Sequence, residues 1–207
     1  METFPFLAAS SDKQKEAFVG RTRQGPSNER LHRLCQKRLE KSVTKSSYVR
    51  YMLDAMKQLG CEVKIDRHLV CEPCGSNVLG GFDPHTHQIV LCENTIYSQG
   101  CMNDTLTHEL IHAYDYCRAH LDWNNLKHLA CTEIRAANLS GDCSFWKENF
   151  ARLKFGWKKH QQECVKERAT KSILCVQDVS ETEARAAVES VFDTCFKDTV
   201  PFERVPP

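Results

Sequence analysis

Hydrophobic positions recur at every third or fourth residue along much of the chain, and this spacing predicts helices. The first such stretch covers residues 28–59, and Gly60 directly after it is a natural helix stop. A second predicted helix runs over residues 105–120, with Asn103 or Asp104 as its N-cap. A third runs over residues 126–139. The chain is therefore expected to be rich in helix.

The C-terminal part also has helical spacing, whereas two short segments have the pattern of strands. Residues 145–175 predict a helix that is bent or broken near its middle. Ser180 and Glu183 form the capping-box signature of a last helix that ends near residue 196. Residues 62–66 alternate between polar and apolar side chains, and residues 88–92 form a short apolar run. Both segments predict strands.

These elements predict an α+β fold in which a small sheet is inserted into a mostly helical domain. Residues 71–84 are rich in Gly, Pro and Asn, which predicts turns between the two strands. Residues 1–28 have no clear period and contain several Gly, Pro and Ser residues. We expect a flexible N-terminal arm over residues 1–28 and one domain over residues 29–207.

Composition and charge narrow the class of protein. The 207 residues are 41% hydrophobic and 27% charged, which is a globular balance. The formal net charge is only +1, so no direct binding of nucleic acid is expected. No stretch approaches the roughly 18–20 apolar residues of a membrane-spanning helix. Peripheral association with a membrane is compatible with this composition.

Cysteine is unusually frequent, with twelve residues spread through the chain. Buried free thiols and disulfides are both compatible with this number. The number is even, and the spread along the chain favours several disulfides over one cluster. The pair Cys71 and Cys74 is assigned to disulfides rather than to a zinc knuckle. The first residues lack the features of a secretory signal or of a conventional mitochondrial presequence. The mitochondrial intermembrane space, which traps proteins by oxidising their cysteines, is the expected compartment.

The segment His108-Glu109-Leu110-Ile111-His112 is the pattern with the clearest chemistry. Residues four apart lie on one face of a helix, so both imidazoles can reach one metal ion. Glu109 can then take a proton from a water molecule on that ion. The flanking residues are uncharged, as expected for a buried helix. The pattern predicts a catalytic zinc site with His108 and His112 as ligands and Glu109 as the base.

A catalytic zinc needs a third protein ligand and an open position. Glu133 is the preferred candidate, because it follows His112 by 21 residues and lies on the next predicted helix, as in His₂Glu sites of the thermolysin type. Asp115 is a rival, although its expected role is to orient an imidazole. His120 and His128 stay open as further rivals.

The strand over residues 88–92 and the group that stabilises the oxyanion each have more than one interpretation. The strand over residues 88–92 is either a sheet edge that pairs with an extended substrate or an ordinary core strand. The group that stabilises the oxyanion of the reaction is also open. Four residues are candidates for it, namely Tyr97, Tyr114, Tyr116 and His128.

Several segments together resemble one known family. They are Gly80–Pro84 (GGFDP), Ile89–Asn94 (IVLCEN), His108–Cys117 (HELIHAYDYC), Cys131–Ala136 (CTEIRA) and Leu139–Cys143 (LSGDC). The chain resembles, over about residues 30 to 200, the mitochondrial inner membrane metalloproteases that process an ATP synthase Fo subunit. Animal members also carry the name of a Ku-binding protein.

The resemblance implies a mostly helical, zincin-like fold and a zinc endopeptidase of the intermembrane space, peripheral to the inner membrane. It carries over His108 and His112 as metal ligands and Glu109 as the catalytic residue, and leaves the third ligand open. The implied substrate is the precursor of an ATP synthase Fo subunit, and a role in Fo assembly is implied as well. The alternatives are a non-proteolytic assembly chaperone and a partner of the DNA-repair protein Ku.

Overall fold

The computed structural model describes residues 28–75, 78–143 and 157–205, and the side chains of residues 157–159 are outside this description. The chain divides into two compact units, Met1–His120 and Leu121–Pro207, which are described in turn. Most of the described residues are helical, and three strands form a small sheet, which confirms the predicted α+β class. The predicted arm over residues 1–28 lies outside the described residues except for Asn28, and the predicted domain boundary stays a prediction.

The described part of the first unit begins with two helices where the sequence predicts one. Helix α2 spans Glu29–Lys45 and helix α3 spans Ser47–Gln58. Ser46 separates them, because its extended backbone ends α2 while its side chain accepts a hydrogen bond from the Val49 amide and caps α3. Gly60 ends α3 at a φ of 83°, as predicted.

The sheet of the first unit contains β1 (Leu69–Glu72), β2 (Gly80–Asp83) and β3 (Gln88–Cys92) in the order β1-β3-β2. Strand β3 pairs in parallel with β1 and antiparallel with β2. The strand predicted over residues 88–92 is therefore confirmed as a strand, and it is central in this sheet rather than an edge. Strand β2 lies within a segment that the sequence predicts as turns.

The strand predicted over residues 62–66 is wrong. Residues Ile65–His68 form the short helix α4, and the strand begins only at Leu69. The physical reason is burial: Ile65 is 43% exposed, so the alternating segment has no apolar face to place against a core. In β1, by contrast, Leu69 and Cys71 are buried and alternate with partly exposed residues.

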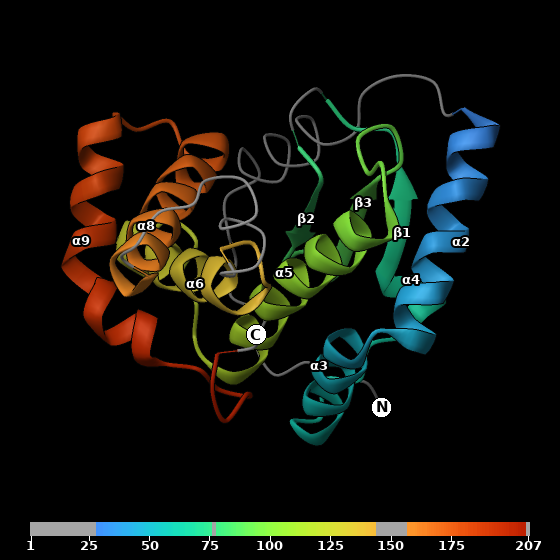
Figure 1. The fold of residues 1–207 in the computed structure, drawn as a ribbon, viewed down its shortest axis with the longest axis horizontal. Helices are drawn as coiled ribbons and strands as arrows, with labels where there is room; N and C mark the ends of the chain where they lie inside the picture. The colour runs from blue at the N-terminus through green and yellow to red at the C-terminus, as the bar shows by residue number, and fades with distance from the viewer. Residues whose placement is uncertain (1–27, 76–77, 144–156, 206–207) are drawn as a thin grey trace. The chain divides into compact units, whose positions relative to one another are not determined.

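Helix α5 (Gln99–Arg118) is the longest element of the first unit and packs against β2, β3, α2 and α3 (Figure 1). It begins six residues earlier than predicted, because Ser98 is its N-cap and accepts from the Cys101 amide at 3.1 Å. The predicted cap Asn103 instead accepts a hydrogen bond from Ser42 at 2.7 Å within the helix packing. Most positions of α5 from Thr105 onward are buried, which agrees with the uncharged residues on both sides of the segment 108–112.

The described part of the second unit contains three helices that pack against one another. They are α6 (Leu126–Leu139), α8 (Trp157–Val176) and α9 (Glu181–Lys197). Helix α6 has the predicted bounds, and α9 begins at the predicted capping box of Ser180 and Glu183. The predicted bend near Gly156 lies outside the described residues.

Five disulfides cross-link the described residues, which confirms the predicted disulfide framework. The first unit contains Cys35–Cys71, Cys61–Cys117 and Cys74–Cys92, and the second contains Cys131–Cys195 and Cys143–Cys164. Cys101 and Cys175 are not part of a disulfide. None of the described helices combines the length and the apolar character needed to cross a bilayer.

Candidate metal centre

His108 and His112 lie one turn apart on α5, in the middle of its buried stretch. Their ring centroids are 4.9 Å apart, and the ring planes meet at 71°. His112 is buried and His108 is half-buried. The i,i+4 spacing in the sequence thus places both imidazoles on the same side of one helix, as expected.

Glu109 lies on the neighbouring face of α5, where the helix contacts β2. Gly80 of β2 is so close that a Cβ atom there would lie 3.6 Å from Cγ of Glu109 and 2.9 Å from Cγ2 of Thr105. The same atom would lie 2.8 Å from the Val90 carbonyl oxygen, which is closer than real Cβ atoms approach. Glycine at this position therefore lets β2 approach the helix at Glu109. The sequence analysis did not identify Gly80 as a residue of the site.

Glu133 lies in the middle of α6 and is only 6% exposed. Two residues before it, Cys131 is cross-linked to Cys195 of α9. A cross-link over 64 residues stabilises a fold by about 4 kcal/mol in the chain-entropy estimate. The position of Glu133 in the second unit is therefore fixed by a covalent bond close to it.

Arg135, two residues after Glu133 and one turn after Cys131, holds the same face of α6. Its guanidinium is buried and forms an ion pair with Asp198 at 2.6 Å. It also donates hydrogen bonds to the carbonyl oxygens of Asp198 and Val200. Asn138 adds a bond to the Phe196 carbonyl oxygen at 3.1 Å. These contacts attach the C-terminal segment to the helix that carries Glu133.

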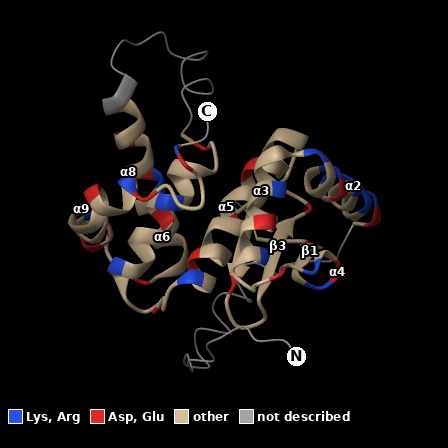
Figure 2. Cartoon of the chain, turned by 90° about the horizontal axis from the view of Figure 1, so that it is seen from below, with Lys and Arg blue, Asp and Glu red and all other residues tan. Residues whose placement is uncertain are grey.

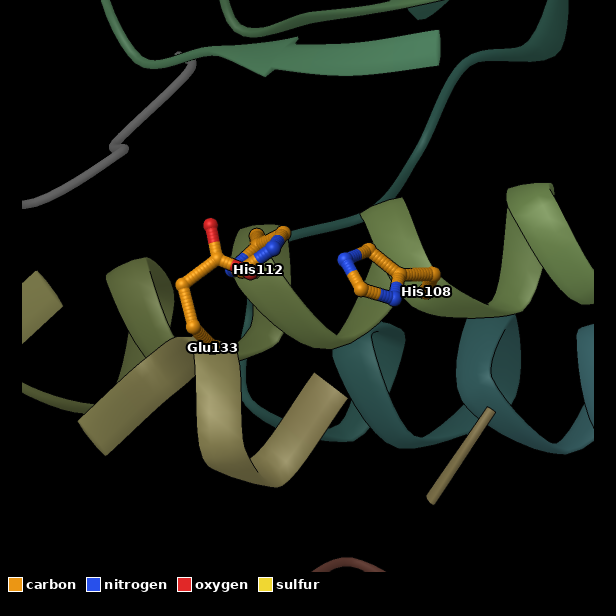
Figure 3. A group of neighbouring side chains, drawn as sticks. All are labelled: His108, His112 and Glu133. Carbon is orange, nitrogen blue, oxygen red and sulfur yellow. The ribbon is translucent and has the colours of Figure 1, made fainter. Parts of the chain in front are cut away.

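Within the described part of the chain, one group of His, Cys, Asp and Glu side chains could hold a metal ion, namely His108, His112 and Glu133. Each residue offers one ligand atom, and these atoms lie within 4.8 Å of one another (Figure 3). Two imidazoles and one carboxylate are the donor set of many catalytic zinc sites. The three residues predicted as ligands are thus the ones that the structure groups together.

The rival ligands lie outside this group. Asp115 is buried, and its carboxylate accepts a hydrogen bond from Nε of Arg118 at 2.9 Å. Nδ1 of His128 accepts from the Asp122 amide at 3.2 Å. His120 is exposed. None of the three belongs to the group of neighbouring ligand atoms.

A half-buried aromatic cluster of the first unit lies at the C-terminal end of α5. The Tyr116 ring contacts Phe82 of β2 at a centroid distance of 5.8 Å and His87 at 5.9 Å. Burial raises the pKa of Tyr116. Burial also lowers the pKa of His87, and the nearby carboxylate of Asp83 opposes this shift. The His87 imidazole is therefore held towards its neutral form.

The other candidates for oxyanion stabilisation differ strongly in exposure. Tyr97 is 77% exposed, whereas Tyr114 is 5% exposed and lies below the Arg118 guanidinium, 5.7 Å from its ring centroid.

Known proteins are similar to this chain over most of its length. The family model described as "Peptidase M76 family" matches residues 33–203. A Homo sapiens protein named mitochondrial inner membrane protease ATP23 homolog is 57% identical over 173 residues, which are 83% of this chain and 70% of that protein. The Xenopus laevis protein of the same name is 56% identical over 83% of this chain and 73% of that protein.

A more distant relative matches a larger share of the chain. An Aspergillus clavatus protein named mitochondrial inner membrane protease atp23 is 38% identical over 202 residues, which are 96% of this chain and 84% of that protein. No solved structure matches the chain at a significant level.

Proposed function

The chain belongs to the peptidase M76 family, and from this premise we propose that it is a zinc-dependent endopeptidase of mitochondria. The observation that carries the proposal is the group of His108, His112 and Glu133, whose ligand atoms lie within 4.8 Å. Two neutral imidazoles and one carboxylate suit zinc and leave a coordination position open for water and substrate. His112 and Glu133 are largely shielded from solvent, which favours a tightly held ion.

Bound at these residues, zinc would lower the pKa of a water molecule to about 7 and polarise the scissile carbonyl. Glu109, next to the first ligand in the sequence, is the proposed general base and takes the proton of the attacking water. The C–N bond of the peptide then breaks, and Glu109 delivers this proton to the leaving amine. The close approach of Gly80 supports this role, because it places the backbone of β2 beside the stem of Glu109.

The proposed substrate is a polypeptide, specifically the precursor of an ATP synthase Fo subunit, and the proposed location is the intermembrane-space face of the inner membrane. The relatives named above are called mitochondrial inner membrane proteases. Five disulfides support an oxidising compartment such as the intermembrane space. We extend the proposal to assistance in Fo assembly. The Ku partner implied by the resemblance stays a prediction.

The proposal is tested with Glu109→Gln, which removes the base and leaves all three ligands in place. We expect zinc content and thermal unfolding to stay normal while peptide hydrolysis falls by at least about 100-fold. Zinc and turnover are measured on the same sample. Near-normal turnover would contradict the assigned role. If the variant still supports Fo assembly in cells that lack the native protein, assembly is a second function separate from proteolysis.

The third ligand is tested by comparing Glu133→Ala with Asp115→Ala. Loss of a direct ligand should remove most of the zinc, whereas loss of a group that only orients a ligand costs about 10–100-fold in affinity or activity. Zinc stoichiometry after dialysis against a weak chelator separates the two outcomes. Full zinc in Glu133→Ala together with loss in Asp115→Ala would reverse the assignment.

A further inference from the structure

Helix α2 carries a row of basic side chains on its outer face. Figure 2 shows Lys and Arg gathered along this helix. They recur at intervals of three or four residues, so they share one side of the helix over a length of about 22 Å. We call them the basic stripe, and its members are Arg30, Arg33, Lys37, Lys41 and Lys45, all exposed.

The basic stripe has little compensating negative charge. Arg33 forms an exposed ion pair with Glu29 at 3.2 Å, which contributes little in water. The other four members form no ion pair with any described residue. Residues 28–59 contain eight Lys and Arg against three Asp and Glu, in a chain whose net charge is only +1. Positive charge is thus concentrated on this part of the first unit.

The orientation of the basic stripe is fixed. The opposite side of α2 buries Cys35, Leu39 and Ser42, and Cys35 is bonded covalently to Cys71 of β1. The stripe therefore faces outward from a rigid support.

Two exposed apolar side chains accompany the charges. Leu34 lies within the basic stripe and is 37% exposed, and Tyr97 is 77% exposed. Arg38 of α2 donates hydrogen bonds to the carbonyl oxygens of Ile96 at 2.6 Å and of Tyr97 at 2.8 Å. These bonds hold the Tyr97 backbone beside the helix. A row of basic groups flanked by an exposed aromatic ring is typical of surfaces that bind the headgroup region of a membrane.

We infer that the basic stripe, with Leu34 and Tyr97, is the surface by which this protein binds an anionic lipid bilayer. The lysines and arginines pair with lipid phosphates, while Leu34 and Tyr97 enter the boundary between headgroups and acyl chains. This inference rests on the membrane location proposed above and names the surface responsible for it. The exposed apolar groups favour a bilayer over a soluble polyanion, which offers no apolar phase.

The test is cosedimentation of the purified full chain with lipid vesicles. We expect binding to vesicles of phosphatidylcholine mixed with cardiolipin, weaker binding at high salt, and no binding to phosphatidylcholine alone. Each basic group near an anionic surface contributes about fivefold in partitioning, so Lys37→Gln with Lys41→Gln should weaken binding about 25-fold. Tyr97→Ser should weaken binding without changing its dependence on salt.

The matched control removes the same charge elsewhere. Lys171→Gln with Arg185→Gln alters two exposed residues of α8 and α9 and should bind the vesicles normally. If the Lys37 and Lys41 variant does not fold, Arg30→Gln with Lys45→Gln provides a second, independent test on the same stripe. Thermal unfolding of each variant verifies the fold.

Three results would overturn the inference. They are normal vesicle binding by the stripe variants, equal binding to neutral vesicles, and tight binding of a single-stranded oligonucleotide without binding of vesicles. Vesicle binding involves no catalytic step, so its failure leaves the proposed peptidase activity untouched. Conversely, Glu109→Gln should lose hydrolysis and keep vesicle binding.

Discussion

Gly80 of β2 and Glu109 of α5 lie so close that a methyl group on the glycine would be in van der Waals contact with the glutamate stem, at 3.6 Å. The same methyl group would overlap the Thr105 side chain and the Val90 carbonyl oxygen. At Gly80, strand β2 thus packs against α5 with its backbone rather than with a side chain. A residue larger than glycine must therefore displace the Thr105 side chain, one turn before the proposed base on α5, or disturb the pairing of β2 with β3 at Val90.

We predict that Gly80→Ala lowers peptide hydrolysis much more than it lowers stability. Overpacking at such a contact costs about 1–3 kcal/mol of unfolding free energy. A displacement of about 1 Å in a catalytic group can cost about 100-fold in rate. The measurements are kcat/KM for a peptide substrate, zinc content and thermal unfolding on the same preparation.

The control for this prediction is Gly100→Ala. Gly100 lies in the first turn of α5, and the nearest atom to a Cβ there is Oγ of Ser98 at 3.9 Å. This alanine should be tolerated and should slightly stabilise the helix. Equal activity of the Gly80 and Gly100 variants would show that the close approach of β2 does not position Glu109.

The sequence predicted the elements whose local pattern agrees with their tertiary environment. The apolar period predicts helix α6 with its observed bounds, and the capping box of Ser180 and Glu183 predicts the start of α9. Strand β2 was missed, since Gly80 and Gly81 have low strand propensity and are required instead by the approach to α5. A contact between distant segments leaves no periodic signal in either of them.

The same difference between local patterns and contacts of distant segments applies to the candidate site. The spacing of His108 and His112 on one helix was sufficient to predict their common face. Glu133 was preferred over Asp115 from its interval and its place on the next helix, and the structure groups Glu133 with the two histidines. The contact of Arg135 with Asp198, 63 residues away, could not be predicted from sequence, because no local pattern pairs them.

The disulfide framework predicts a specific thiol count. Protein isolated from its native compartment should contain two alkylatable thiols before reduction, on Cys101 and Cys175, and twelve after reduction. Only Cys175 should react without unfolding, because Cys101 is buried. Mass spectrometry of the alkylated protein gives both numbers. Twelve reactive thiols before reduction would contradict both the cross-links and the proposed compartment.

Arg135→Met should destabilise the second unit. The change removes a buried guanidinium that pairs with the Asp198 carboxylate and donates hydrogen bonds to two carbonyl oxygens. Breaking such a pair costs about 3–5 kcal/mol of unfolding free energy. Chemical denaturation measures this loss. Arg185→Met is the matched control, because that exposed arginine pairs with Glu181 one turn away and should cost less than about 0.5 kcal/mol. Similar losses in the two variants would argue against a structural role for Arg135.

His87 predicts a dependence of stability on pH. Burial lowers the pKa of its imidazole in the folded state, with a smaller opposing effect from Asp83 and contributions from Arg67 and His85. The unfolded chain therefore takes up a proton near pH 6.5 while the folded chain does not. The contribution of His87 to stability is accordingly present above this pH and is lost as the pH falls below it.

His87→Asn should remove this contribution and flatten the acid side of the stability curve. Asparagine is the suitable replacement, because His87 has a φ of 57° and asparagine tolerates that left-handed conformation. Loss of the ring contact with Tyr116 lowers the free energy of unfolding equally at every pH. The slope of stability against pH, and not its absolute value, therefore reports the protonation of His87. The effect should be small, a change in Tm of about 1–2 °C between neutral and mildly acidic pH, since the ring is only half-buried. His85 has the smallest of the named effects on the pKa of His87, so His85→Asn should change the slope less than His87→Asn. An equal change of slope in both variants would assign the pH dependence to another group.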